Sequence, residues 1–256
     1  MTVVHERADA LGIARITLAN PAKLNALSAA MWRELRAVVR ACEADPATRV
    51  VVVDGAQGQF AAGGDIEEFP DFRFDAATLA RFHEEDVRPA LVALRDSDLP
   101  FVAQIEGACI GGGLEIAACC DIRIAAQGAR FGVPIARLGF PMAPAELEIV
   151  AAVVGPTVLR ELLIEARVLD AGEALARGLV TRVVPDATVR SEARAAAERI
   201  ARLSPQALRL NKRALREFAR APLSDAAARL PHYDYAASAE HKEGLAAFNE
   251  KRAPRF

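Results

Sequence analysis

The sequence predicts an α/β fold with a helical C-terminal region. Apolar runs of strand length alternate with helix-like segments along most of the chain, a pattern typical of α/β proteins. Two of these runs, Val50–Asp54 and Phe101–Ile105, are almost entirely apolar, as expected for strands buried on both faces of a sheet. From Asp186 onward the sequence becomes helical and rich in Ala and Arg. We therefore expect an α/β core over residues 1–185 and a helical region over residues 186–256.

The N-terminal part predicts a pair of strands followed by two helices. Val3–Glu6 and Ile13–Leu18 flank a turn and form a hairpin-like pair. Ser28 is a typical N-cap for a helix that runs to about Ala44. The segment Ala76–Arg95 has the length of a second, long helix.

The second half continues the alternation. Phe131–Met142 contains two glycines and two prolines and predicts a loop with little regular structure. Pro144 suits the first position of a helix, which Gly155 and Pro156 interrupt. The other expected elements are the strands Ile122–Ala125 and Val180–Val184, a short helix Ala171–Arg177 capped by Asp170, and helices that begin near Ser204 and Pro222.

The composition is that of an ordinary globular protein. Of 256 residues, 52% are hydrophobic and 26% are charged, so the chain can bury a sizeable core. A net charge of −2 gives no electrostatic footprint for nucleic acid or for an anionic membrane. No apolar run approaches the roughly 18 residues of a membrane span, and the first residues show no signal-peptide pattern. We expect a cytoplasmic protein without membrane or nucleic-acid partners.

The cysteines and histidines do not predict a metal site. Three of the four cysteines lie in apolar surroundings and no CxxC pair occurs, which indicates reduced, buried residues. The four histidines show no metal-ligand spacing. One of them, His83, lies in a charged helical segment and is interpreted as a solvated side chain.

The most informative stretch is Gly107–Asp121, which reads GACIGGGLEIAACCD. Three glycines separate a strand-like run from an apolar helix-like run whose only charged member is Glu115. The first N–H groups of a helix lack internal partners and carry partial positive charge. Glu115 beside exposed amides therefore suits chemistry on a carbonyl. The competing interpretation is a capped helix, with Gly112 as N-cap and Glu115 bonded back to it.

A second glycine loop strengthens the first interpretation. The strand-like run Val50–Asp54 leads to Phe60–Asp65, which reads FAAGGD. If this strand lies beside Phe101–Ile105, backbone N–H groups from the two loops can converge on one oxygen. Such a pair is an oxyanion hole, in which each donor is worth about 3–4 kcal/mol of barrier.

Several segments resemble the crotonase family, also called the enoyl-CoA hydratase/isomerase superfamily. FAAGGDI (Phe60–Ile66) and IEGACIGGGLEIAACCDIRIA (Ile105–Ala125) are similar to its two signature segments. The other similar segments, in the family's order, are NPAKLNAL (Asn20–Leu27), ARFGVPIARLGFP (Ala129–Pro141), LDAGEALARGLVTRVVP (Leu169–Pro185) and FNEKRAPRF (Phe248–Phe256).

This resemblance implies a fold, a substrate class and site residues. The fold is a spiral of ββα units, followed by a C-terminal helical region that builds homotrimers or dimers of trimers. The substrate is an acyl-CoA or enoyl-CoA thioester whose enolate is stabilised at the thioester oxygen, and CoA enters as part of the substrate, without a further cofactor. Oxyanion donors fall on the N–H groups of Gly64 and Gly112, and Glu115 falls on the first catalytic glutamate. The residues that fall in CoA-binding segments are Lys23, Leu24, Ala62, Asp65 and Ile66.

The second hydratase glutamate is missing, because its position is occupied by Ile135. One account has Glu115 alone moving the proton, which gives an isomerase or a slower hydratase. A second lets another acid substitute, with Glu146 or Glu148 closest in sequence. A third assigns the oxyanion hole to decarboxylation or thioester hydrolysis, and a non-catalytic acyl-CoA-binding protein is a further alternative.

Several side chains near these segments are open to two interpretations. Phe69, Phe72, Phe74 and Phe82 form either plain core or the wall of an acyl pocket. Arg137, two residues after the missing glutamate, is expected to face the pocket.

Overall fold

The computed structural model describes residues 1–220 and 230–256, so the helix start expected near Pro222 lies outside the described residues. A six-stranded sheet in the order β1-β2-β3-β4-β6-β9 forms the centre, and a three-stranded sheet, β5-β7-β8, lies beside it. The strands are β1 (Thr2–Glu6), β2 (Ile13–Ala19), β3 (Val50–Gly55), β4 (Phe101–Ile105), β5 (Ala108–Ile110), β6 (Ile122–Ala126), β7 (Arg130–Gly132), β8 (Val168–Asp170) and β9 (Arg182–Val184).

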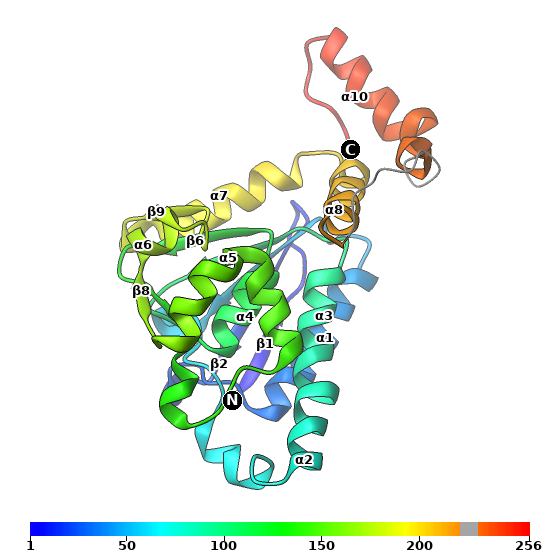
Figure 1. Cartoon of the computed structure of the whole chain (residues 1–256). Coiled ribbons are helices and arrows are strands. Elements are labelled where there is room, and N and C mark those ends of the chain that lie inside the picture. Colours follow the sequence, from blue (N-terminus) through cyan, green and yellow to red (C-terminus); the bar gives the residue numbers. More distant parts are fainter. Residues whose placement is uncertain (221–229) are drawn as a thin grey trace.

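Helices cover both faces of the larger sheet (Figure 1). The α-helices are α1 (Ala29–Ala44), α2 (Ala76–Arg81), α3 (Arg88–Asp96), α4 (Gly112–Cys119), α5 (Pro144–Ile164), α6 (Ala171–Ala176), α7 (Val189–Ala201), α8 (Pro205–Arg220) and α10 (Ala239–Asn249). The shorter helical segments are η1 (Pro21–Lys23), η2 (Ala56–Gly58), η3 (Ile66–Asp71), the π-helical η4 (Phe82–Val87), η5 (Pro134–Leu138), η6 (Asp186–Thr188) and η7 (Leu230–Ala237).

The predicted α/β class is confirmed, and β3 shows why its sequence is apolar throughout. Strands β2, β3, β4, β6 and β9 run parallel, and β1 pairs antiparallel with β2. Val51 and Val53 pack into the larger core on one face, whereas Val50 and Val52 pack into a second core that includes α7. Because successive side chains point to opposite faces, a strand covered on both sides needs no polar alternation.

The N-caps predicted at Ser28 and Asp170 are confirmed. Ser28 caps α1 by accepting a hydrogen bond from the Met31 N–H, and Asp170 with Glu173 forms a capping box at α6. Gly155, with φ +72°, interrupts the helical geometry of α5 where the sequence predicted a break.

Two segments differ from their predictions. Residues 131–142 are more ordered than the loop that was expected, because they contribute to β7, which pairs with β5 and β8, and to η5. The long helix predicted over Ala76–Arg95 is divided into α2, the π-helical η4 and α3. A π-helical turn holds one residue more than an α-helical turn and changes which side chains face the core.

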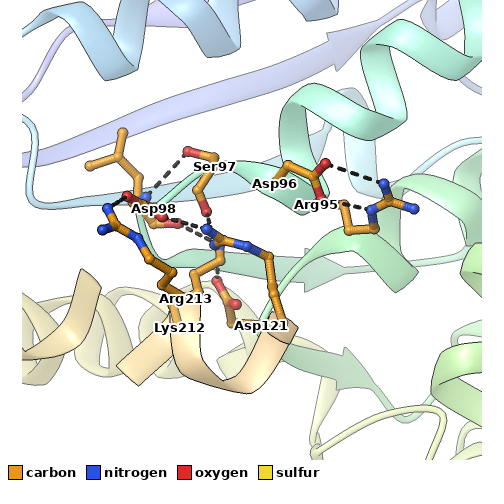
Figure 2. A network of polar contacts seen from close by, with 9 residues as sticks. Arg95, Asp96, Ser97, Asp98, Asp121, Lys212 and Arg213 are labelled. Carbon is orange, nitrogen blue, oxygen red and sulfur yellow. Dashed lines mark hydrogen bonds and ion pairs between the residues drawn. The ribbon is translucent and has the colours of Figure 1, made fainter. Parts of the chain in front are cut away.

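The C-terminal helices differ in how they join the core. Helix α7 packs on the sheet. Helix α8 forms ion pairs with residues that precede β4 and β6, and Figure 1 shows α10 beyond α8, away from the sheet. In the polar network of Figure 2, Lys212 on α8 lies 2.8 Å from the Asp121 carboxylate, and Arg213 lies 2.6 Å from that of Asp98. The domain boundary at residue 185 stays a prediction. No described helix is long and apolar enough to cross a membrane.

Candidate active site

The two glycine loops lie side by side, because β3 and β4 are parallel neighbours. The Ile110 N–H donates to the Ala61 carbonyl at 2.9 Å, and the loops are joined by a parallel bridge between Ala61 and Cys109. A Cβ placed on Gly111 would lie 3.5 Å from the Cα of Gly63. The backbones therefore meet at the glycines themselves.

Backbone geometry explains the glycines of the second loop. Gly111 has φ +50°, in the region that glycine adopts most readily. A Cβ on Gly113 would lie only 2.5 Å from the Ala61 carbonyl oxygen, so a side chain there would push the loops apart. Helix α4 begins at Gly112, whose N–H is one of the helix's orphan donors. Among the described residues, neither this N–H nor that of Gly64 has an acceptor.

Glu115 is buried in α4 and does not cap it. The N-cap is Gly111, which makes no side-chain capping bond, so the capped-helix interpretation is wrong. The residue is 6% exposed. Burial raises the pKa of its carboxyl well above the ordinary value, the nearby Glu146 charge raises it further, and Arg73 opposes this shift. Glu115 is therefore a buried acid whose neutral form is favoured.

Glu146 is held by a residue that the sequence did not identify. Its Oε1 lies 2.6 Å from Nδ1 of His83, an arrangement in which Nδ1–H donates to the carboxylate. Both side chains are largely buried, so the expectation of a solvated His83 is wrong. His83 lies in the π-helical η4, and this local change of helical geometry carries it to the cavity.

These groups line one cavity of about 290 Å³. Its wall contains Gly64, Gly112, Glu115, His83 and Glu146. Such a concave, largely apolar space with a few convergent polar groups is the usual form of a small-molecule site.

Ile135 also lines the cavity, in η5, where it contributes apolar surface. Phe69 and Phe82 contribute to the wall, Phe72 stacks behind Phe82 at 4.1 Å between ring centroids, and Phe74 points outward with 86% exposure. The phenylalanine group therefore divides between pocket wall, core and surface. Arg137 lines the cavity as expected, and its guanidinium donates to the Ala166 carbonyl at 2.9 Å.

The residues expected to bind CoA lie in two adjoining loops, one of which lines the cavity. Lys23 Nζ lies 2.6 Å from Asp65 and 2.8 Å from Glu67, and these hydrogen bonds raise the pKa of Lys23. Asp65 also caps η3. Ala62 and Ile66 line the cavity, and the Ala62 N–H donates to the Leu24 carbonyl at 3.0 Å, so all five residues belong to two adjoining loops.

Arg73 is a second cavity residue that sequence reasoning missed. Its guanidinium carbon lies 4.1 Å from the ring centroid of Phe69 and 3.8 Å from that of Phe140. Burial lowers the pKa of Arg73, while the charges of Glu146 and Glu115 raise it. It follows the end of the short η3 segment, where no periodic pattern marks a functional side chain.

Comparisons with known proteins agree with this geometry. The family model for enoyl-CoA hydratase/isomerase matches residues 9–256. A probable enoyl-CoA hydratase of Mycobacterium bovis is 36% identical over 258 residues, covering 100% of this chain and 97% of the relative. The 2,3-dehydroadipyl-CoA hydratase of Escherichia coli is 33% identical, covering 94% of this chain and 93% of the relative.

A solved structure extends the similarity to three dimensions. The crystal structure of an enoyl-CoA hydratase/carnithine racemase from Magnetospirillum magneticum has a TM-score of 0.93 and 40% sequence identity, and the match covers 99% of this chain and 94% of that one. The crotonase fold and these relatives define the chain as an enzyme that acts on CoA thioesters. It belongs to the enoyl-CoA hydratase/isomerase family, and the resemblance noted in the sequence is confirmed.

Proposed function

We propose that this enzyme hydrates an enoyl-CoA thioester through an oxyanion-stabilised enolate, with Glu115 as acid/base. The observation that carries the proposal is that the Gly64 and Gly112 amides, Glu115 and Glu146 line one cavity. Both amides lack an acceptor among the described residues, and such donors stabilise negative charge that develops on a thioester oxygen.

The two carboxyl groups suit complementary roles. Glu146, with His83 donating to it, takes a proton from water, and the water oxygen bonds to C3 of the substrate. The C2=C3 electrons move toward the thioester oxygen, which the two amides stabilise. Glu115, whose raised pKa favours the proton-bearing form, then protonates C2. The proton on Glu146 must return to Glu115 before the next turnover.

Binding of the CoA part is assigned to the two adjoining loops beside the cavity. Lys23, Leu24, Ala62, Asp65 and Ile66 would hold the CoA part, and no further cofactor takes part in the proposed steps. The name of the Escherichia coli relative specifies one acyl group, but 33% identity does not carry that choice to this chain.

The test is turnover of a panel of enoyl-CoA thioesters, followed by the loss of the conjugated thioester absorbance. We expect Glu115→Gln and Glu146→Gln each to lower kcat about 10²–10⁴-fold, the range for a general acid or base. Glu148→Gln is the matched control, because Glu148 lies two residues further along α5 and is exposed. The control should retain full activity.

Three other outcomes would contradict the proposed mechanism or favour one of its alternatives. Unchanged activity in Glu115→Gln would contradict the acid/base assignment. Double-bond isomerisation that survives Glu146→Gln would favour Glu115 acting alone. If the protein binds acyl-CoA but turns over none of the thioesters, the alternative of a non-catalytic acyl-CoA-binding protein is favoured.

We also propose that the protein forms homotrimers or dimers of trimers. Support comes from large apolar side chains exposed on α8 and α10, a surface that favours burial in an interface. Among them, Phe218 is 65% exposed and Phe248 is 82% exposed. Light scattering should give three or six times the chain mass of 27.4 kDa, and a mass of 27.4 kDa would contradict the proposal. A cytoplasmic location stays a prediction.

A further inference from the structure

We infer that Arg73 binds an anionic group on the acyl part of the substrate, so that the preferred acyl chain carries a second carboxylate. This inference rests on the proposed function, because it concerns the substrate of the same cavity.

Arg73 is held in place by aromatic rings. Phe69 and Phe140 lie 4.1 and 3.8 Å from the guanidinium carbon, and the two rings contact each other edge to face at 5.8 Å. A guanidinium over an aromatic ring gains cation–π attraction without using its N–H groups. The rings therefore fix the cation and leave its donors available.

These donors find no acceptor among the described residues. The Nε atom is buried without a hydrogen-bond partner, and no described carboxylate forms an ion pair with the guanidinium. A buried donor left unpaired costs about 1–3 kcal/mol, more when it is charged. A ligand that supplies the acceptor would remove this cost, and carboxylate matches the planar guanidinium fork.

The other basic side chains that line the cavity already have hydrogen-bond partners. His83 is bonded to Glu146, and Arg137 donates to the Ala166 carbonyl. Among the described residues that line the cavity, Arg73 is thus the cation without a direct partner.

The position of Arg73 points to the acyl group rather than to the phosphates of CoA. The ring of Phe69, which Arg73 contacts, lies 3.1 Å from a Cβ placed on Gly64, next to one proposed oxyanion donor. The charges of Glu115 and Glu146 also act on Arg73, as expected near the reacting carbons. The CoA phosphates are separated from the thioester by the whole pantetheine arm.

The experiment compares enoyl-CoA thioesters of equal length with and without a terminal carboxylate. The pairs are crotonyl- and fumaryl-CoA, 2-pentenoyl- and glutaconyl-CoA, and 2-hexenoyl- and 2-hexenedioyl-CoA. For at least one length, we expect kcat/KM to favour the diacid about 10–100-fold, the worth of a charged hydrogen bond. Arg73→Met should lower this diacid-to-monoacid ratio at least tenfold, and Arg73→Lys should retain part of it.

Binding gives a readout that does not depend on turnover. Calorimetry with adipyl-CoA and hexanoyl-CoA should show tighter binding of adipyl-CoA to the parent protein and loss of that preference in Arg73→Met. Because these saturated thioesters cannot be hydrated, their binding tests the role of Arg73 separately from the proposed reaction. If the protein turns over no enoyl-CoA, the proposed hydratase reaction is wrong, and the binding preference alone decides whether Arg73 binds a carboxylate.

Three results would overturn the inference. A preference for the monoacid at every length would exclude a carboxylate anchor. An equal loss on both members of each pair would make Arg73 a counter-ion for Glu115 and Glu146. Weaker binding of free CoA to Arg73→Met, with the diacid ratio unchanged, would assign Arg73 to the CoA phosphates instead.

Discussion

A buried cationic side chain has hydrogen-bond partners where α8 joins the core, whereas one in the cavity has none among the described residues. Lys212, 8% exposed, donates to the Leu99 carbonyl at 2.6 Å and lies 2.8 Å from Asp121. Arg73, in the cavity, has a buried Nε without a described acceptor. Because an unpaired buried donor costs stability, a charge that serves the fold is expected to be paired. The unpaired one marks a place where a ligand completes the bonding.

Backbone groups show the same contrast. At α6 the capping box of Asp170 and Glu173 satisfies N–H groups at the helix start. At α4 the Gly112 N–H is left open, and Gly111 offers no side chain to cap it. The open helix start faces the cavity, and the capped one serves the fold.

Among the variants that test this contrast between open and paired groups, the largest predicted effect comes from removing the open Gly112 N–H. Gly112→Pro deletes the N–H at the first position of α4, which proline tolerates in a helix. We expect kcat to fall about 10²–10³-fold relative to Gly112→Ala, as for other oxyanion donors. Steady-state kinetics with the best enoyl-CoA substrate measures this ratio.

Gly112→Ala is the matched control because both variants add a Cβ, which would lie 2.8 Å from the Trp32 ring. Thermal unfolding should show both variants folded. Equal kcat in the two variants would mean that the Gly112 N–H does not act on the thioester oxygen.

The next effect tests whether His83 positions Glu146. His83→Leu removes the donor that lies 2.6 Å from the Glu146 carboxylate, so we expect kcat to fall about 10–100-fold, the worth of a charged hydrogen bond.

His83→Asn supplies an amide donor near the position of Nδ1 and should recover part of the rate. If the leucine and asparagine variants behave alike, the histidine contributes packing only.

A smaller effect is expected at Lys212, the buried charge that has partners. Its removal should change the stability of the fold without changing catalysis. Lys212→Met removes the hydrogen bonds to Leu99 and Asp121, so the free energy of unfolding should fall by about 2 kcal/mol in urea titrations. Its kcat/KM per folded molecule should match the parent.

Arg213→Met is the comparison variant, because Arg213 is 51% exposed and its pair with Asp98 should contribute at most about 1 kcal/mol. A loss in Lys212→Met no larger than this would contradict the structural role of the buried lysine.

Features that depend on residues close together in the sequence could be predicted from it, whereas features that depend on distant residues could not. The cap at Ser28 and the close approach of the glycine loops were predictable, because short segments carry the donors, the acceptors and the small residues. His83 and Arg73 were not. The first depends on a π-helical turn, and the second on Phe140, which lies 67 positions away in sequence (140 − 73). Long-range packing determines such positions, and a single sequence does not display it.

The last prediction concerns how the buried carboxyl of Glu115 makes the free energy of unfolding depend on pH. Its pKa in the folded protein is raised above the ordinary 4.5, so between pH 4.5 and the folded pKa the folded chain keeps a proton that the unfolded chain releases. The free energy of unfolding should therefore decrease as pH rises through that window, and the loss should persist above it. Glu115→Gln cannot ionise, so its advantage over the parent should grow with pH in urea titrations. The exposed Glu148→Gln should follow the parent at every pH, and a Glu115→Gln profile parallel to the parent's would mean that the carboxyl is not held in its neutral form.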